Sequence, residues 1–155
     1  MSRTKIDYGI DLGTTNSAIA RMESGEPKIK KTDIGADTMQ SCISFNKRKS
    51  ILVGQSASNS YRKEKLEAMT KFEVNTSNTA IEFKRTMGTD KKYPSTFMER
   101  DYSSEELSAE ILKTLKSFVS DEDILSAVIT VPAKFTTTQI DATQKSAELA
   151  GFSHV

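Results

Sequence analysis

Near the N-terminus, a run of small and hydroxylated residues follows an acidic one, a combination suited to binding phosphate groups. The run is Gly13-Thr14-Thr15-Asn16, and Asp11 stands two positions ahead of it. Glycine permits a tight turn, and successive backbone N–H groups of such a turn can point into one concavity that holds phosphate oxygens. Asp11 would supply a carboxylate to a phosphate-bound Mg²⁺, with water between, because Mg²⁺ loses its hydration reluctantly. An ordinary hairpin turn uses the same residues, so this segment alone leaves both interpretations open.

Other catalytic and nucleotide signatures do not occur in the sequence. There is no G-x-x-x-x-G-K-[ST] run and no G-x-G-x-x-G run, which excludes a P-loop and a Rossmann phosphate site. The only histidine is His154 and no G-x-S-x-G occurs, so a serine triad lacks its parts. The only cysteine, Cys42, cannot form an intrachain disulfide or a multi-cysteine metal site. Its apolar neighbours predict instead that Cys42 is a small residue filling a strand.

The segments around the candidate phosphate turn have the alternation of strands. Ile6, Tyr8, Ile10 and Leu12 alternate with other residues, which predicts a strand that ends at the turn. Further extended segments are predicted at residues 18–22, 42–45 and 51–53, with a turn at 24–27. The first third of the chain is therefore predicted to be an antiparallel meander.

Helices are predicted in the last third. Ser103 with Glu106 forms a capping box, and apolar residues follow on one face, namely Leu107, Ile111, Leu115, Phe118 and Val119. A second capping box, Thr136 with Gln139, predicts a helix that runs to Leu149-Ala150 and ends at Gly151. Between the helices, residues 126–131 form an apolar run that predicts a strand buried on both faces and ended by Pro132. The expected fold class is α/β, with an antiparallel meander followed by helix, strand and helix.

Length and charge bound the remaining possibilities. A chain of 155 residues is the size of one domain, and 22 Lys and Arg against 21 Asp and Glu give a net charge of +1, so folding rather than disorder is expected. Residues 46–100 hold twelve basic and six acidic side chains, a local charge of +6, whereas 101–155 hold four and nine, a local charge of −5. The mixed charges around Leu66, Met69 and Phe72 favour a short helix with one inward face over a nucleic-acid surface. No apolar run has the length of a signal or membrane-spanning segment, so a cytoplasmic protein without membrane contact is expected.

Two longer motifs stand at opposite ends of the chain. Residues 8–17 are Tyr-Gly-Ile-Asp-Leu-Gly-Thr-Thr-Asn-Ser, and residues 127–133 are Ala-Val-Ile-Thr-Val-Pro-Ala. Between them stand Ile43-Ser44-Phe45, Val53-Gly54-Gln55, Phe83-Lys84-Arg85-Thr86-Met87-Gly88 and Glu105-Glu106-Leu107-Ser108-Ala109. In residues and in order, these segments resemble the seventy-kilodalton heat-shock (DnaK-type) chaperone family, over nearly the whole chain.

The resemblance implies the first lobe of an actin-like, ribonuclease-H-like ATPase domain, with an outer subdomain at roughly residues 46–103. On the matched positions, Gly13, Thr14, Thr15 and Asn16 would form the first phosphate loop for ATP or ADP. Asp11 would belong to the water shell of Mg²⁺, and Lys84 would be the catalytic lysine that stabilises charge on the transferring phosphoryl group. Without the resemblance, Lys84 would be interpreted as a solvated helix lysine.

The same resemblance implies partners that lie outside residues 1–155. These are a second ATPase lobe, a peptide-binding domain that takes up unfolded polypeptides, and J-domain and nucleotide-exchange cochaperones. The chain is accordingly expected to be a fragment that hydrolyses hardly any ATP alone, because half a cleft cannot fix the phosphates.

Several positions depart from the family pattern. Pro132 is linked in the family to relaying the nucleotide state to the peptide-binding domain, but Lys134 and Ile140 stand where tyrosine and arginine are usual. Residues 56–75 are longer than the family's equivalent, and 88–103 are shorter, which predicts that strands of the outer subdomain are absent there. These departures leave open a nucleotide-dependent scaffold or assembly protein on the same fold, without peptide-chaperone activity.

Overall fold

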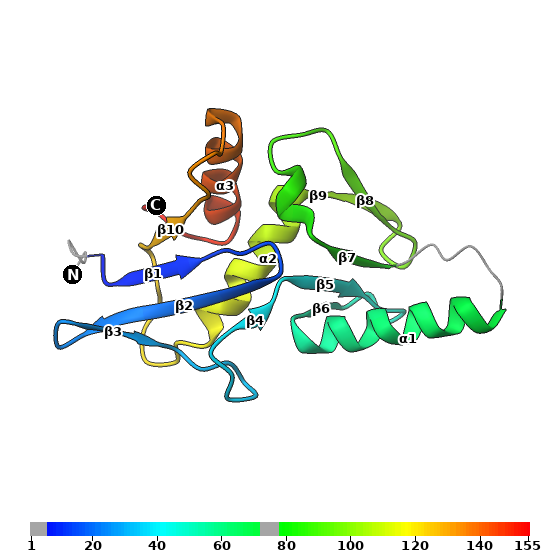
Figure 1. The fold of residues 1–155 in the computed structure, drawn as a ribbon, viewed down its shortest axis with the longest axis horizontal. Coiled ribbons are helices and arrows are strands. Elements are labelled where there is room, and N and C mark those ends of the chain that lie inside the picture. The colour runs from blue at the N-terminus through cyan, green and yellow to red at the C-terminus, as the bar shows by residue number, and fades with distance from the viewer. Residues whose placement is uncertain (1–5, 72–77) are drawn as a thin grey trace.

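The computed structural model describes residues 6–71 and 78–155, which form a main sheet, an outer part and the helices between and beside them (Figure 1). The main sheet has the strand order β10-β1-β2-β3, and β4 pairs with the first residues of β2. Its strands are β1 (Tyr8–Asp11), β2 (Asn16–Glu23), β3 (Glu26–Ile29), β4 (Met39–Gln40) and β10 (Val128–Thr130).

The alternation read from the sequence explains the first strand. Tyr8 and Ile10 are buried against the core, whereas Gly9 and Asp11 face outward. Strands β1, β2 and β3 follow one another antiparallel, and β10 pairs parallel to β1 with Gly9 opposite Val128. The mixed α/β class and the antiparallel pair of β1 and β2 are therefore confirmed. The meander differs from the prediction, since β3 was not predicted and the strands at residues 42–45 and 51–53 lie in a second sheet.

The outer part begins where the main sheet ends. It contains a three-stranded sheet of β6 (Ile51–Val53), β5 (Cys42–Phe45) and β7 (Thr79–Ile81), a hairpin of β8 (Lys92–Ser95) and β9 (Arg100–Ser103), a short 3-10 turn η1 (Phe83–Thr86) and the helix α1 (Gln55–Lys71). Residues 88–103, which the sequence predicted to lack strands of the family's outer subdomain, contain the hairpin of β8 and β9. Cys42 is buried in β5 as predicted, and burial raises the pKa of its thiol to about 11.

The helix α2 (Ser104–Ser117) lies between the two sheets and holds them together. Its predicted capping box is present: the Ser103 hydroxyl accepts from the Glu106 N–H at 3.2 Å, and the Glu106 carboxylate accepts from the Ser103 N–H at 2.8 Å. Leu107, Ile111 and Leu115 are fully buried on its inner face, as the spacing predicted. Since α2 contacts both β2 and β5, its apolar face forms the common core.

The helix α3 (Thr137–Leu149) packs against α2, beside the main sheet. Thr136 and Gln139 form the second predicted capping box. Gly151 follows the helix with φ +86°, a conformation that favours glycine and ends the helix where the sequence predicted.

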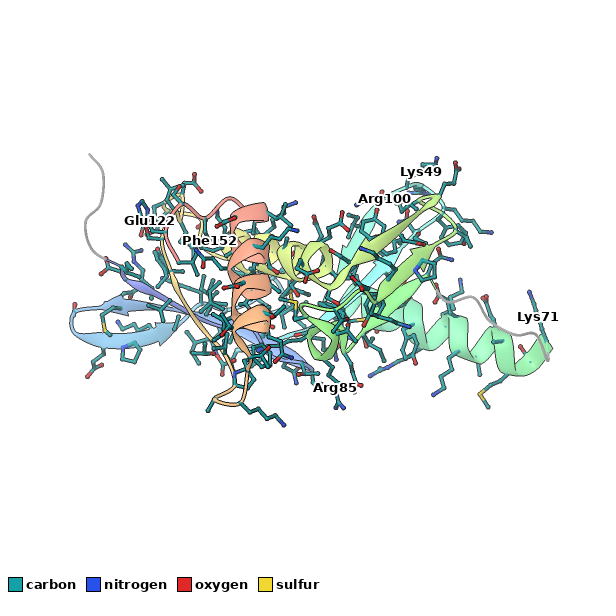
Figure 2. All side chains as sticks on the ribbon, turned by 90° about the horizontal axis from the view of Figure 1, so that it is seen from above. Lys49, Lys71, Arg85, Arg100, Glu122 and Phe152 are labelled. Carbon is teal, nitrogen blue, oxygen red and sulfur yellow. The ribbon has the colours of Figure 1, made fainter. Side chains whose placement is uncertain are left out.

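Two predictions about burial were wrong. The strand predicted at residues 126–131 is shorter, and its Val128 is 57% exposed, because β10 is an edge strand with only one covered face. The predicted short helix is a long one, and its supposed inward residues Leu66 and Met69 are 64% and 69% exposed. The first part of α1 packs against the outer sheet, and Figure 2 shows its outer half projecting from the body with Lys71 at its tip, where no neighbouring element packs against it. Phe72, assigned to the same face, lies outside the described residues.

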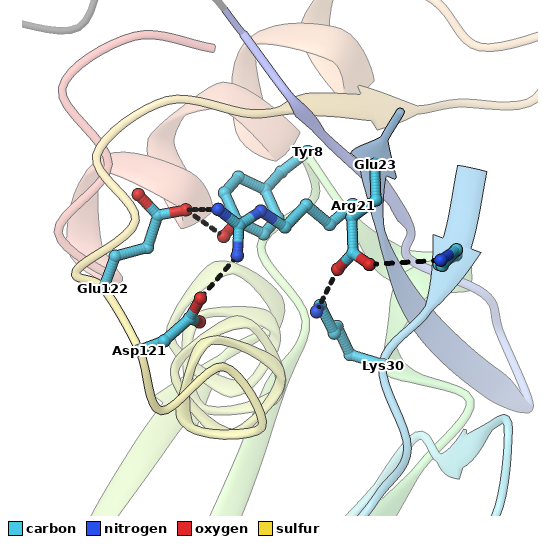
Figure 3. Close-up of polar contacts among 7 residues, drawn as sticks. Tyr8, Arg21, Glu23, Lys30, Asp121 and Glu122 are labelled. Carbon is cyan, nitrogen blue, oxygen red and sulfur yellow. Dashed lines mark hydrogen bonds and ion pairs between the residues drawn. The ribbon is translucent and has the colours of Figure 1, made fainter. Parts of the chain in front are cut away.

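A polar network ties the start of the main sheet to the loop after α2 (Figure 3). The Arg21 guanidinium contacts the carboxylates of Asp121 at 2.6 Å and Glu122 at 3.0 Å, and lies 5.7 Å from the centre of the Tyr8 ring. The Tyr8 hydroxyl donates to Glu122. Burial raises the pKa of Tyr8, and the Glu122 carboxylate raises it further, so the phenol stays protonated and remains a donor.

Within the described residues, no helix is both long and apolar enough to span a membrane.

Candidate phosphate-binding site

The turn between β1 and β2 has a shape that only glycine permits at its start. A Cβ on Gly13 would lie 1.9 Å from the backbone oxygen of Asn16, far inside van der Waals contact. At Gly9, two residues before the end of β1, a Cβ would meet nothing within 4 Å. The glycine at position 13 is therefore a steric requirement of this turn.

Two buried hydroxyl groups lie beneath the turn. The Ser41 hydroxyl donates to the Gly13 carbonyl at 2.8 Å, and the Ser17 hydroxyl accepts from the Gly13 N–H at 3.1 Å. The two hydroxyl oxygens are 2.9 Å apart. The Gly13 N–H thus points inward, which corrects the expectation that the successive N–H groups of the run all face one concavity. Thr14 is half-buried, and Thr15 and Asn16 are exposed.

Lys84 comes to the turn from the outer part. It lies in η1, and its ammonium group donates to the carbonyl oxygen of Leu12, the residue before Gly13. Only 6% of Lys84 is exposed, so the solvated-lysine interpretation is wrong. Burial lowers the pKa of Lys84, and the nearby Asp11 carboxylate opposes that shift. A partly dehydrated ammonium beside a backbone turn is suited to an anionic ligand, because a buried charge gains most from a partner.

Asp11 faces the solvent on the last residue of β1. One carboxylate oxygen accepts from the Thr130 hydroxyl at 3.1 Å, which aligns the group across β1 and β10. Among the described residues there is no cluster of three or more His, Cys, Asp or Glu side chains that could hold a metal ion. Asp11 therefore fits a Mg²⁺ that arrives with phosphate and water ligands, and does not fit a site made by protein ligands alone.

The loop between β10 and α3 forms the third side of the site. The Phe135 ring centre is 5.5 Å from the Lys84 ammonium nitrogen, and the Phe135 N–H donates to the Pro132 carbonyl at 2.9 Å. Pro132 itself is exposed. Gly88, just after η1, approaches Thr138 so closely that a Cβ would lie 3.0 Å from it, which fixes η1 against the start of α3. Three distant segments therefore meet at the turn (Figure 1).

The structure adds site residues that the sequence did not single out. Ser17 and Thr130 lie inside the two long motifs but had no role assigned to them, and Ser41 and Phe135 lie outside those motifs; all four contact the predicted residues. A cavity of about 150 Å³ borders Asn16 and Gln40, and the Gln40 side-chain oxygen is buried there without a hydrogen-bond partner among the described residues. A larger one of about 620 Å³ lies away from the turn, between the start of α1 and the end of α2.

Fold and site together define a mixed α/β protein with a glycine turn, a carboxylate and a buried lysine assembled as a candidate anion site. Comparison with protein families gives a match to the family described as Hsp70 protein, over residues 7–155. The chain belongs to the Hsp70 family, whose members are chaperones that bind ATP and ADP.

Proposed function

We propose that this chain is the first lobe of an Hsp70-type ATPase, and that the turn at Gly13 to Asn16 holds the phosphates of ATP or ADP. The observation that carries the proposal is the buried ammonium of Lys84, held at the carbonyl of Leu12 from a position 72 residues away in the chain. Burying a lysine against a surface turn costs free energy, and an anionic phosphate group would offset that cost.

Each site residue then has a defined role in the proposed reaction. Backbone N–H groups of the turn bind phosphate oxygens, and Lys84 stabilises negative charge as the phosphoryl group transfers. Asp11, aligned by Thr130, orients the water shell of Mg²⁺, which when bound would neutralise charge between the phosphates. Phe135 limits the access of water to the Lys84 ammonium.

The wider organisation belongs to the same proposal. Residues 1–155 would be one ribonuclease-H-like lobe, with residues 46–103 as its outer subdomain, completed by a second lobe and a DnaK-type peptide-binding domain. In that assembly ATP hydrolysis would control the binding of unfolded polypeptides, with J-domain and nucleotide-exchange partners. Pro132 would relay the nucleotide state to the peptide-binding domain, because its loop carries Phe135 to the site. Ile140, 44% exposed beside this loop on α3, occupies the position of the family's arginine.

The test is a titration of the chain with MgATP and with adenosine, followed by two-dimensional amide NMR, which detects weak binding. We expect MgATP to shift the signals of Thr14 and Thr15 and expect adenosine to leave them unchanged. Saturating MgATP that moves no signal between residues 11 and 17 would overturn the proposed phosphate loop.

A matched pair of lysine variants sharpens this test. Lys84→Met should weaken MgATP binding by about tenfold or more, since a charge-assisted contact contributes about 1.5–3 kcal/mol. Lys92→Met, on exposed β8, should bind as the unmodified chain does. Equal binding by the two variants would remove Lys84 from the site.

A further inference from the structure

The two serines beneath the phosphate turn occupy an unusual position. Ser17 and Ser41 are 1% and 4% exposed, so neither can reach a ligand. Ser41 follows β4 and comes from a part of the chain 24 residues beyond Ser17. Buried hydroxyls are normally hydrogen-bonded to nearby backbone, but these two bond to each other and to both backbone groups of one glycine.

The donors and acceptors in this group are fixed by counting protons. A serine hydroxyl has one proton to donate, and that of Ser41 goes to the Gly13 carbonyl. The bond between the two hydroxyls must therefore run from Ser17 to Ser41. Since the Ser17 oxygen accepts from the Gly13 N–H, the hydrogen bonds form a closed ring that begins and ends at Gly13.

Ser41 also holds a second point of the turn through its backbone. Its N–H donates to the Thr15 carbonyl at 2.8 Å, so the carbonyls of Gly13 and Thr15 both point toward Ser41. In a planar trans peptide, the C=O and the following N–H point in opposite directions. The N–H groups of Thr14 and Asn16 consequently point away from Ser41.

The Leu12–Gly13 peptide has the opposite orientation. Its N–H points inward to Ser17, and its carbonyl faces Lys84. The turn therefore presents the Leu12 carbonyl to Lys84 and leaves the N–H groups of Thr14 and Asn16 for a ligand. Ser17 accepts from the inward-facing Gly13 N–H, and Ser41 donates to the inward-facing carbonyls of Gly13 and Thr15.

We propose that Ser41, together with Ser17, is a positioning residue that sets the direction of the phosphate-binding N–H groups in this turn. This inference rests on the proposed nucleotide function and assigns a residue that touches no substrate. The ligand chemistry that it serves is the phosphate chain of the nucleotide, and the base and ribose are outside its reach.

Ser44 provides a matched control. It is 1% exposed and lies three residues beyond Ser41, and its hydroxyl accepts from the Thr79 hydroxyl at 3.0 Å in the outer sheet rather than bonding to the turn. Alanine at position 44 therefore removes an equally buried hydroxyl without touching the phosphate turn.

The experiment measures the dissociation constant of MgATP and the thermal midpoint for the unmodified chain and for Ser41→Ala, Ser17→Ala and Ser44→Ala. We expect about tenfold weaker MgATP binding for Ser41→Ala and for Ser17→Ala, and unchanged binding for Ser44→Ala. The double variant Ser17→Ala with Ser41→Ala should bind about as weakly as either single variant, because each breaks the same ring. The Thr14 amide signal should shift in both single variants without nucleotide, whereas the Asn16 signal should move less, because the Ser41 backbone N–H still holds the Thr15 carbonyl.

The outcomes separate the two proposals. If the unmodified chain binds no MgATP, the proposed function fails and the positioning role fails with it. If it binds and Ser41→Ala binds as well as Ser44→Ala at similar thermal midpoints, only the positioning role is overturned. If Ser41→Ala does not fold, Ser17→Ala decides: it breaks the ring at the Gly13 N–H and leaves the Ser41 contact with the Gly13 carbonyl to support the fold. MgATP binding by Ser17→Ala as tight as that by Ser44→Ala would then overturn the positioning role.

Discussion

The phosphate turn and the helix α1 differ in which side chains they bury: the turn buries polar ones, and α1 exposes apolar ones. At the turn, a lysine and two serines are buried and hydrogen-bonded. On α1, Leu66 and Met69 stand in the solvent, and among the described residues of that helix only Ala57 is buried. Residue type therefore does not decide burial here. The number of neighbouring elements does, because three segments meet at the turn and almost none meets the outer half of α1 (Figure 2).

The largest expected effect compares one leucine in each region. Leu107→Ala on α2 should lower the free energy of unfolding by about 2–5 kcal/mol, since Leu107 is fully buried between the sheets and leaves a cavity. Leu66→Ala should change it by less than about 0.5 kcal/mol, because its side chain is already solvated. Denaturant unfolding of both variants measures the difference. A loss above 2 kcal/mol at Leu66 would mean that the outer helix is covered in solution.

The next effect compares two glycines in and beside the turn. Gly13→Ala should cost about 1–3 kcal/mol of stability, because its Cβ would overlap the Asn16 backbone oxygen and the turn must open. It should also abolish phosphate-induced shifts at Thr14. Gly9→Ala meets no atom within 4 Å and should leave both properties unchanged. Similar behaviour of the two variants would mean that the turn adapts easily and is no preformed cradle.

Local signals in the sequence predicted local structure well. Both capping boxes, the antiparallel pair of β1 and β2 and the helix end at Gly151 depend on a few adjacent residues, and each appears where it was predicted. The order of the family-like segments singled out Lys84, and in the structure this lysine is buried beside the turn. Its catalytic role stays a prediction.

Features that depend on distant neighbours could not be predicted in this way. The sequence pattern around Leu66 is the same whether a second surface covers it or not, so its exposure follows from tertiary arrangement alone. The predicted burial of Val128 was wrong for a related reason, since its strand lies at the edge of the sheet and this side chain is exposed. Ser41 contacts Gly13 across 28 positions, and a single buried serine leaves no pattern from which that contact could be inferred.

A third prediction concerns the polar tie between the main sheet and the loop after α2 (Figure 3). Tyr8→Phe removes the hydroxyl that donates to Glu122 but keeps the ring, so it should cost about 1–2 kcal/mol. Arg21 still pairs with Glu122, which limits the loss. Thermal unfolding measures the effect. A stability equal to that of the unmodified chain would show that the ring alone, and not the hydrogen bond, secures the loop.

The smallest expected effect lies on α1. Lys63 and Glu67 form an exposed pair at 4.0 Å, four residues apart on the helix, whereas Glu122 meets both Arg21 and Tyr8 in a partly buried site. Glu67→Gln should therefore cost less than about 0.5 kcal/mol, and that cost should vanish at 1 M salt because solvent ions screen exposed charges. Glu122→Gln should cost more at both salt concentrations, because its hydrogen bonds are shielded from solvent. Equal losses of stability for the two variants, or equal salt dependence, would mean that the network of Tyr8 and Arg21 is as solvated as the outer helix. The two regions would then differ only in their burial of apolar side chains.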